Sequence, residues 1–217
     1  MAHVIKIEKL TLKQMIFDQS YHSLADDLIN VPLPESFKIC NKRFPIPQSV
    51  DEFSKNLCYA QRLFLPRKED NDFGAIVRTI DGYYYPIVNC KMWDDEKALH
   101  FGKNVLSCKV IELYPVAMRL IQYTSDLLEN EYRLLHREPT KQEIAAGVDK
   151  LNIFSELYSL NFLRDDMKIS TQEVLLTPYN EILVRFMMHK ETEDFRKRYE
   201  DLLRMEAEAK SKKGIKK

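Results

Sequence analysis

Glycine is scarce in this chain, and its scarcity excludes the commonest phosphate-binding loops. Only five glycines occur among 217 residues, and they form neither a GxGxxG nor a GxxxxGK[ST] pattern. The cysteines stand singly, with no CxxC pair and no histidine three or four residues away: Cys40, Cys58, Cys90 and Cys108. Because a structural zinc ion usually takes its ligands in close pairs, the sequence predicts free thiols, no metal site and no cofactor.

Long apolar runs and an excess of charge of one sign are missing as well. No run approaches the twenty apolar residues that span a bilayer, and the formal net charge is zero. The first residues, 1–17, mix charged and apolar side chains and lack the continuous apolar core of a secretory signal. We therefore expect a protein that stays in the cytoplasm where it is made, without a membrane partner. Nucleic acid is expected to be contacted, if anywhere, through the five lysines of residues 210–217.

Sequence signatures of catalysis are also missing. Neither GxSxG nor HExxH occurs, and no cysteine lies in a local catalytic signature. The acidic residues are numerous, but no pair stands out by its spacing. The sequence thus predicts a protein that is not an enzyme and has no catalytic residues.

Apolar residues recur at steps of three and four through most of the chain, which predicts a mainly α fold. Helix starts are indicated by Thr140 with Glu143 and by Ser170 with Glu173, since each pair can form a capping box. Thr177 before Pro178 indicates a third start. The helices are expected at 11–29, 49–65, 94–108, 112–136, 141–163 and 178–208.

One stretch, 74–88, has the character of a β-hairpin. A β-branched apolar run precedes Asp81-Gly82 and an aromatic run follows it, and Asp-Gly favours a tight turn. We expect Gly82 to have a positive φ. The three tyrosines at 83–85 would then lie half-buried on the hairpin or, alternatively, stack on bases or sugars at a surface. A second, short strand is expected at 3–7.

These elements divide the chain into three parts. Residues 1–48 are expected to form an N-terminal helix and a proline-rich connector or arm, residues 49–190 a helical core with the hairpin, and residues 191–217 a charged helical tail. The connector either packs on its own domain or reaches a neighbouring subunit. The predicted core residues are Phe53, Leu57, Leu63, Trp93, Leu99, Val116, Leu120, Leu127, Phe154, Leu157, Leu160, Leu183 and Phe186.

The last predicted helix changes character along its length. Its first turns are broadly apolar, whereas beyond His189 charged residues dominate. One face is expected to run through Ile182, Phe186, His189, Thr192, Phe195, Tyr199 and Leu202. Among the charges, apolar residues remain that include Phe195, Tyr199, Leu202 and Leu203. So narrow a stripe suits docking into a groove on a partner. The alternatives are that it folds back onto its own domain or that this end of the helix is solvated.

A nine-residue stretch offers one resemblance to a known family. Residues 137–140, Arg-Glu-Pro-Thr, followed by Glu143-Ile144-Ala145, resemble the REPT-x-x-EIA run that opens a helix-turn-helix in bacterial primary-type sigma factors. The resemblance implies a DNA-binding regulatory protein. The chain departs from the family directly afterwards, where Ala146-Gly147-Val148 leads into a long amphipathic helix.

A second resemblance lies in residues 169–183, which contain Thr177-Pro178-Tyr179. This segment is similar to the C-terminal part of small assembly proteins of tailed bacteriophages, which have a short helix, a Pro-Tyr turn and a last helix ending in charge. The resemblance implies a structural or assembly protein of the virion: a tail, neck or ring component, or an assembly chaperone. Its partners would be other virion or assembly proteins, or copies of itself in a ring. Its location would be the cytoplasm of a bacterial host or the virion.

Overall fold

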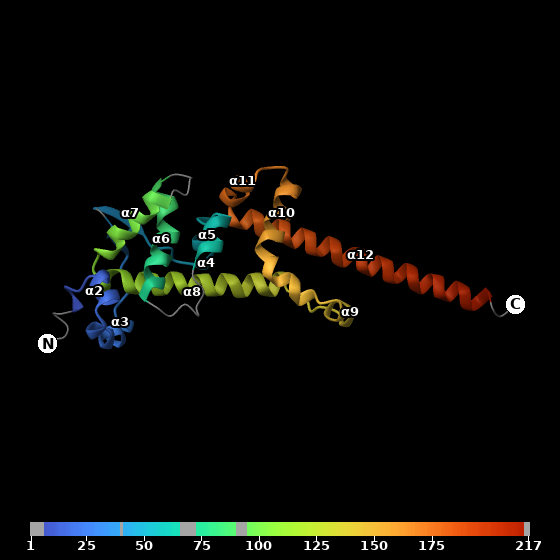
Figure 1. Ribbon diagram of the computed structural model, residues 1–217, viewed down its shortest axis with the longest axis horizontal. Coiled ribbons are helices and arrows are strands. Elements are labelled where there is room, and N and C mark those ends of the chain that lie inside the picture. Colours follow the sequence, from blue (N-terminus) through green and yellow to red (C-terminus); the bar gives the residue numbers. More distant parts are fainter. Residues whose placement is uncertain (1–6, 40, 66–72, 90–94, 215–217) are drawn as a thin grey trace.

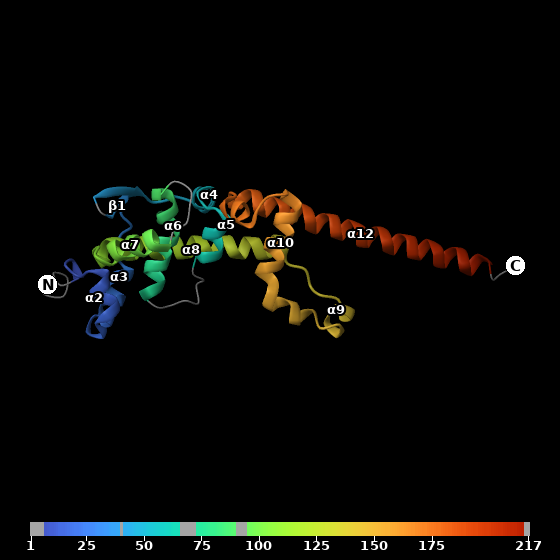
Figure 2. The ribbon, with the colours of Figure 1, turned by 45° about the horizontal axis from the view of Figure 1, so that its top comes forward.

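The chain is mainly α, as the sequence predicts, with a two-stranded antiparallel hairpin and a long C-terminal helix. The computed structural model describes residues 7–39, 41–65, 73–89 and 95–214. Figures 1 and 2 show an elongated molecule with its two termini at opposite ends. The elements are α2 (Leu12–Phe17), the 3₁₀ helix η1 (Gln19–Leu24), α3 (Ala25–Ile29), β1 (Ser36–Ile39), β2 (Lys42–Pro45), α4 (Val50–Lys55), α5 (Tyr59–Phe64), α6 (Phe73–Asn89), α7 (Asp95–Leu106), α8 (Val110–Leu135), α9 (Lys141–Ala145), the 3₁₀ helix η2 (Val148–Phe154), α10 (Ser155–Met167), α11 (Thr171–Leu176) and α12 (Tyr179–Gly214).

Helix α8 is the axis on which the body is built. It contacts α3, α4, α6 and α12, and Figure 1 shows these elements distributed along its length. One face of α8 is buried because its apolar residues recur at helical spacing. The buried residues are Val110, Leu113, Val116, Ala117, Leu120, Tyr123, Thr124 and Leu127. Beyond Leu127 this burial ends, so the last two turns of α8 extend past the main core.

The hairpin predicted at 74–88 is wrong, because these residues form helix α6. The same segment also has a helical period, in which Ile76, Ile80, Tyr83 and Tyr84 fall on neighbouring turns and are all buried. Helix α6 packs between α7 and α8, and this tertiary burial outweighs the β propensity of the individual residues. The three tyrosines are therefore core residues, not a displayed stacking surface.

The helical state of α6 is supported by a side chain from α5. Pro86 has no backbone N–H, so the Gly82 carbonyl four residues earlier lacks its usual helical donor. The buried side chain of Gln61 donates from Nε2 to the Gly82 carbonyl at 3.1 Å and to the Tyr83 carbonyl at 3.0 Å. Gln61 thus supplies the hydrogen-bond donor that Pro86 lacks, and the buried Gly82 carbonyl is not left unpaired.

The positive φ predicted for Gly82 is also wrong, because Gly82 is helical and buried against α5. A Cβ at this position would meet Phe64 Cδ1 at 3.2 Å. We expect Gly82→Ala to change the free energy of unfolding by less than about 1 kcal/mol, since the gain in helix propensity offsets a small shift of the half-exposed Phe64 ring. Gly82→Val should destabilise by about 1 to 3 kcal/mol through overpacking. Urea unfolding of both variants checks this, and equal losses for Ala and Val would contradict the helical placement.

The β-hairpin of this protein instead lies in the proline-rich connector. Strands β1 and β2 pair with Phe37 opposite Phe44, and Asn41 at the turn has a φ of 62°. Both phenylalanines are buried against Tyr84 of α6, with ring centroids 4.9 and 5.4 Å away, and the Tyr84 hydroxyl donates to the Pro45 carbonyl at 2.9 Å. The connector therefore packs on its own domain, which is the first of the two predicted alternatives.

Three of the predicted long helices are interrupted in the structure. Residues 11–29 form α2, η1 and α3; residues 49–65 form α4 and α5; and residues 141–163 form α9, η2 and most of α10. The break at Cys58 lets the backbone pair with the start of α12. The Tyr59 N–H donates to the Thr177 carbonyl at 3.0 Å, and the Tyr179 N–H donates to the Leu57 carbonyl at 2.9 Å. Non-local backbone pairing of this kind leaves no periodic signal in the sequence.

The predicted helix starts agree with the structure more closely than the predicted helix lengths. Thr140 and Ser170 form complete capping boxes with Glu143 and Glu173. Thr177, however, does not cap α12, because its hydroxyl donates to the Glu173 carbonyl at 2.9 Å and it terminates α11. Helix α12 begins one residue after Pro178.

The predicted core is partly confirmed. Phe53, Leu57, Val116, Leu120 and Leu127 are buried. The residues that pack on the core while staying partly exposed are Leu63, Leu160, Leu183 and Phe186. Phe154 and Leu157 are about half exposed, so their assignment to the core is wrong. The Trp93 and Leu99 side chains and residues 3–6 of the predicted strand lie outside what the structure describes.

The buried tyrosines make the stability sensitive to alkaline pH. Burial raises the pKa of Tyr83 to about 12 and raises the pKa of Tyr84 further, from an ordinary value of 10. The folded state therefore holds these protons more tightly than the unfolded state. Their contribution to stability is complete below pH 10 and is lost as the pH rises from 10 towards 12.

We expect the urea midpoint to fall over this pH interval and to fall less steeply in Tyr83→Phe, which removes one titrating group. Tyr199→Phe is the matched control, because Tyr199 is 54% exposed. An equal pH dependence in the wild type and in Tyr83→Phe would contradict the assignment of the shift to this tyrosine.

Candidate interaction surface

Helix α12 has one face that anchors it to the body. Tyr179 and Ile182 are buried, and Phe186 stacks on Phe162 of α10 at 6.0 Å. Further along the same face, Lys190 Nζ donates to the Leu134 carbonyl at 2.8 Å. Lys197 Nζ lies 3.5 Å from Glu143 Oε1, beside α9. The body therefore holds α12 through its first five turns.

The opposite face of α12 carries the four residues predicted to bind a partner. Phe195, Tyr199, Leu202 and Leu203 are all about half exposed, and the Phe195 and Tyr199 rings stack at 6.2 Å. A helix turns by about 100° per residue, so Lys197 and Arg204, nine residues after Met188 and Phe195, lie on the far side from this stripe. The single face predicted from Ile182 to Leu202 is thus wrong, because the anchoring residues and the exposed residues lie on different sides.

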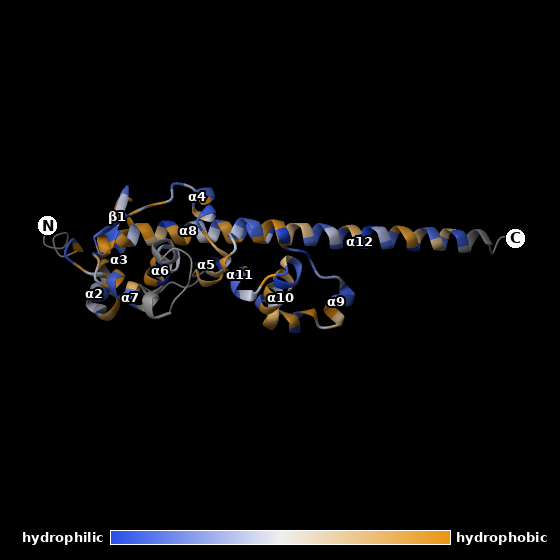
Figure 3. Ribbon diagram, turned by 90° about the horizontal axis from the view of Figure 1, so that it is seen from above, coloured by the Kyte–Doolittle hydropathy of each residue, from blue (hydrophilic) through white to orange (hydrophobic). Residues whose placement is uncertain are grey.

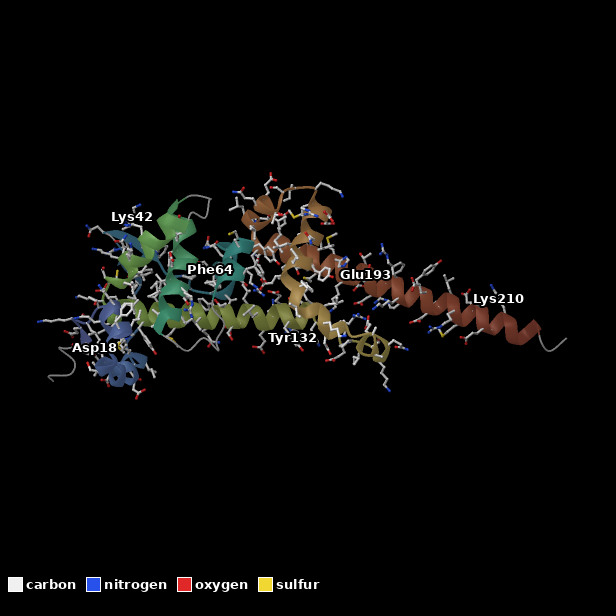
Figure 4. All side chains as sticks on the ribbon, viewed as in Figure 1. Asp18, Lys42, Phe64, Tyr132, Glu193 and Lys210 are labelled. Carbon is white, nitrogen blue, oxygen red and sulfur yellow. The ribbon has the colours of Figure 1, made fainter. Side chains whose placement is uncertain are left out.

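The exposed stripe begins on the body itself. Val184 and Met188 lie on the same side as Phe195, Tyr199 and Leu202, and they are 53% and 65% exposed. We call Val184, Met188, Phe195, Tyr199, Leu202 and Leu203 the α12 stripe. Figure 3 shows apolar residues continuing among polar ones along the projecting part, and in Figure 4 the part of α12 around Lys210 stands clear of other elements. In this structure the stripe therefore does not fold back onto the core of its own chain.

A second exposed apolar face lies on the segment formed by α9, η2 and the first half of α10. We call this segment the α10 arm; its exposed apolar residues are Ile144, Leu151, Ile153, Phe154, Leu157 and Tyr158. The second half of α10 is anchored, since Leu163 is buried and Arg185 pairs with Asp166 at 2.8 Å. The first half therefore stands away from the body (Figures 1 and 2).

The sequence interpretation missed the α10 arm because it read one helix through 141–163. Gly147, with a φ of 84°, ends α9 and starts the 3₁₀ segment. Beyond this break, Phe154 and Leu157 are at least half exposed. A glycine directly after a short periodic segment is a helix stop signal, so Ala146-Gly147 is the sequence feature that could have revealed the break.

Hydrogen bonds to the Glu143 carboxylate hold the segment that resembles the sigma factors. Arg137 donates to Glu143 Oε1 at 2.7 Å, and the Thr140 N–H donates to Glu143 Oε2 at 2.7 Å. These hydrogen bonds, the one from Arg137 foremost, lower the pKa of Glu143 to about 2. With Lys197 also beside it, Glu143 connects the start of α9 to α12. The motif here thus caps α9 and lies beside α12.

A hollow of about 430 Å³ lies beside α8 and is lined by Arg62, Leu128, Glu131, Tyr132, Leu135 and His136. The charged groups in it are engaged with each other. Arg62 forms a bidentate pair with Glu131 at 2.8 and 3.0 Å, and the Tyr179 hydroxyl donates to Glu131 at 3.0 Å. Tyr132, labelled in Figure 4, stacks on His136 at 4.2 Å. The Glu131 carboxylate already accepts hydrogen bonds from Arg62 and Tyr179, so it is not a free general base in this hollow.

One buried carboxyl remains outside these networks. Asp81 Oδ1 has no hydrogen-bond partner among the described residues, and burial raises the Asp81 pKa to about 6. Gly102 of α7 lies against the other oxygen, where a Cβ would come within 3.7 Å. A single carboxyl without an acid, base or cation beside it does not define a catalytic site.

The thiols and the acidic residues do not converge on a metal site within the described ranges. Cys58 and Cys108 are reduced thiols, and Cys40 and Cys90 lie outside the described residues. No cluster of three or more histidine, cysteine, aspartate or glutamate side chains occurs in the part of the chain that the structure describes. In the same part, no helix combines the length and the apolar character needed to cross a bilayer.

Comparison with protein-family models, with curated protein sequences and with solved structures finds no match to this chain.

Proposed function

We propose that this chain is a non-enzymatic structural or assembly protein of a tailed bacteriophage that acts through protein–protein contacts. The observation that carries the proposal is the α12 stripe, an apolar row on a preformed helix, turned away from the face that the body uses. A helix that is already folded binds with a smaller loss of conformational entropy than a disordered segment. The stripe and the α10 arm together suit a protein whose partners are other proteins.

The phage assignment is supported by the resemblance of residues 169–183 to small phage assembly proteins. In the structure these residues form α11, the turn at Pro178 and the anchored start of α12. The resemblance therefore covers the base from which the projecting helix extends. A tail, neck or ring component, or an assembly chaperone made in the cytoplasm of the bacterial host, fits this architecture. Other virion proteins or copies of the chain itself would be its partners.

The alternative, a helix-turn-helix regulatory protein, gains less support from the geometry. Helix α9 has five residues and continues into a 3₁₀ segment. The free half of α10 presents Leu157 and Tyr158 together with Glu156, whereas a DNA-reading helix needs cationic and hydrogen-bonding side chains at its exposed face.

Truncation of the encoding gene in the phage tests the proposal. Truncation after Arg198 removes Tyr199, Leu202 and Leu203 but keeps the Lys197–Glu143 contact, so the purified protein should retain its melting temperature. Particle assembly should fail with the truncated chain, and mass spectrometry of assembly intermediates should detect the full-length chain in the wild type but not the truncated chain in the variant. Truncation after Lys210, which keeps the whole stripe, is the matched control. Normal yields of infectious particles from the Arg198 truncation would overturn the proposed role of the helix.

A further inference from the structure

Four residues of the α12 stripe, together with Thr192, have the spacing of a coiled-coil seam. Met188, Thr192, Phe195, Tyr199 and Leu202 follow one another at steps of four, three, four and three residues. Such a 3.5-residue repeat keeps one edge of a helix facing a second helix with the same repeat. Arg185 precedes this seam and Glu206 follows it, so charged residues limit it at both ends.

From this spacing and from the exposure of the seam, we propose that two copies of the chain associate through their α12 helices as a parallel two-helix coiled coil. The inference rests on the proposed function, because it names a second copy of this chain as the partner of the same stripe. The seam residues would form five layers, with Phe195 and Leu202 packed against their counterparts in the second copy. Met188 is exposed where α12 still lies on the body, so the seam begins beside the two bodies.

The residues beside the seam carry both negative and positive charge. This favours a second copy of the chain over a partner whose surface carries charge of only one sign. Glu191 lies on one flank of the seam and Arg196 on the other, five residues further along. In a parallel pair these are the flanking positions that meet between helices, so each Glu191 lies near Arg196 of the other copy. In an antiparallel pair centred on the seam, Arg196 would instead face Arg196. Within one copy, Glu191 pairs with Arg198 and Arg196 with Glu193, and these exposed pairs exchange partners at little cost.

The body lowers the cost of this association. Nucleation is the unfavourable step in forming an isolated helix, and α12 is already nucleated and held by contacts that reach Lys197. Only the turns beyond Lys197 depend on the helix alone. The seam is shorter than the three to four heptads of an independent coiled coil, so we expect a reversible dimer with a dissociation constant on the order of 10 μM.

Sedimentation of the full-length protein from about 1 to 100 μM tests the association. The wild type should shift from monomer to dimer, and Phe195→Asp should weaken the dimer at least about 30-fold, as for a central interface anchor. Phe195 is 58% exposed, so this variant should fold normally by circular dichroism. Ala207→Asp is the matched control, because Ala207 is exposed on a side of α12 away from the seam, and it should dimerise like the wild type.

Disulfide trapping tests the orientation. Leu202→Cys should give a covalent dimer under mild oxidation, since equivalent seam residues meet in a parallel pair. Lys197→Cys, on the opposite face, and the wild type with its native cysteines should not. A wild type that is monomeric at 100 μM, a dimer unaffected by Phe195→Asp, or a dimer without the Leu202→Cys crosslink would each overturn the proposal. Open-ended oligomers would also overturn it, because they would indicate that the stripe binds the α10 arm of a neighbouring copy. If the purified chain is a monomer but is found in phage particles, this inference is refuted and the proposed function is not.

Discussion

Replacing Phe53 with alanine should lower the free energy of unfolding by about 3 to 5 kcal/mol. Phe53 is fully buried, stacks on Tyr83 at 4.9 Å and lies 5.8 Å from the Tyr123 ring. It thus joins α4 to both α6 and α8. Removing the ring leaves a cavity where three helices meet and also removes the aromatic contacts, each of which contributes about 1 kcal/mol beyond its buried area.

Phe17→Ala provides the matched control, because the Phe17 side chain is 72% exposed at the end of α2. The same chemical change there should cost less than about 0.5 kcal/mol. Urea or thermal unfolding of the two variants measures the difference. Similar losses at both positions would mean that Phe53 does not occupy the junction of α4, α6 and α8.

Replacing Glu131 with alanine should destabilise the protein by about 2 to 3 kcal/mol. Burial alone would lower the pKa of Arg62, but the hydrogen bonds with Glu131 outweigh it and raise the pKa above its ordinary value. Without Glu131, the 15%-exposed Arg62 guanidinium and the Tyr179 hydroxyl both lose their partner. Breaking a buried ion pair costs about 3 to 5 kcal/mol, and the partial exposure of this pair reduces the loss.

Asp201→Ala is the control for a surface pair, since Arg204 and Asp201 are both more than half exposed. It should change stability by less than about 0.5 kcal/mol. Glu131→Gln should lose less than Glu131→Ala, because an amide still accepts a hydrogen bond from Arg62 or Tyr179. Wild-type stability in Glu131→Ala would show that this carboxylate is free for another role, and the hollow beside α8 would then need to be reconsidered as a chemical site.

Local signals in the sequence predicted local structure well. Thr140 and Ser170 form their capping boxes because every atom of that motif lies within four residues. The long helices α8 and α12 are recognisable because their apolar repeats continue over many turns. The exposed residues Phe195, Tyr199, Leu202 and Leu203 were singled out for a related reason: a thin apolar stripe among charges shows in the sequence itself.

The competition between helix and strand at 73–89 could not be decided locally. Asp81-Gly82 between β-branched and aromatic runs favours a turn, and the same residues also have a helical period. The helix prevails because Gln61 supplies the donor that Pro86 lacks and because α7 and α8 both pack against the helix. Neither contact is visible from residues 73–89 alone.

The sequence by itself determined that the protein is mainly α, where several helices begin, and that the end of the chain carries an apolar stripe among balanced charges, because short-range hydrogen bonding and periodicity fix these features. Only the tertiary structure decided which sides of the helices are covered. It left Phe154 and Leu157 exposed beyond the break at Gly147, and it placed the contacts of Lys190 and Lys197 opposite the α12 stripe. Burial depends on which distant elements meet, and a repeat along one helix shows that an apolar face exists without showing what covers it.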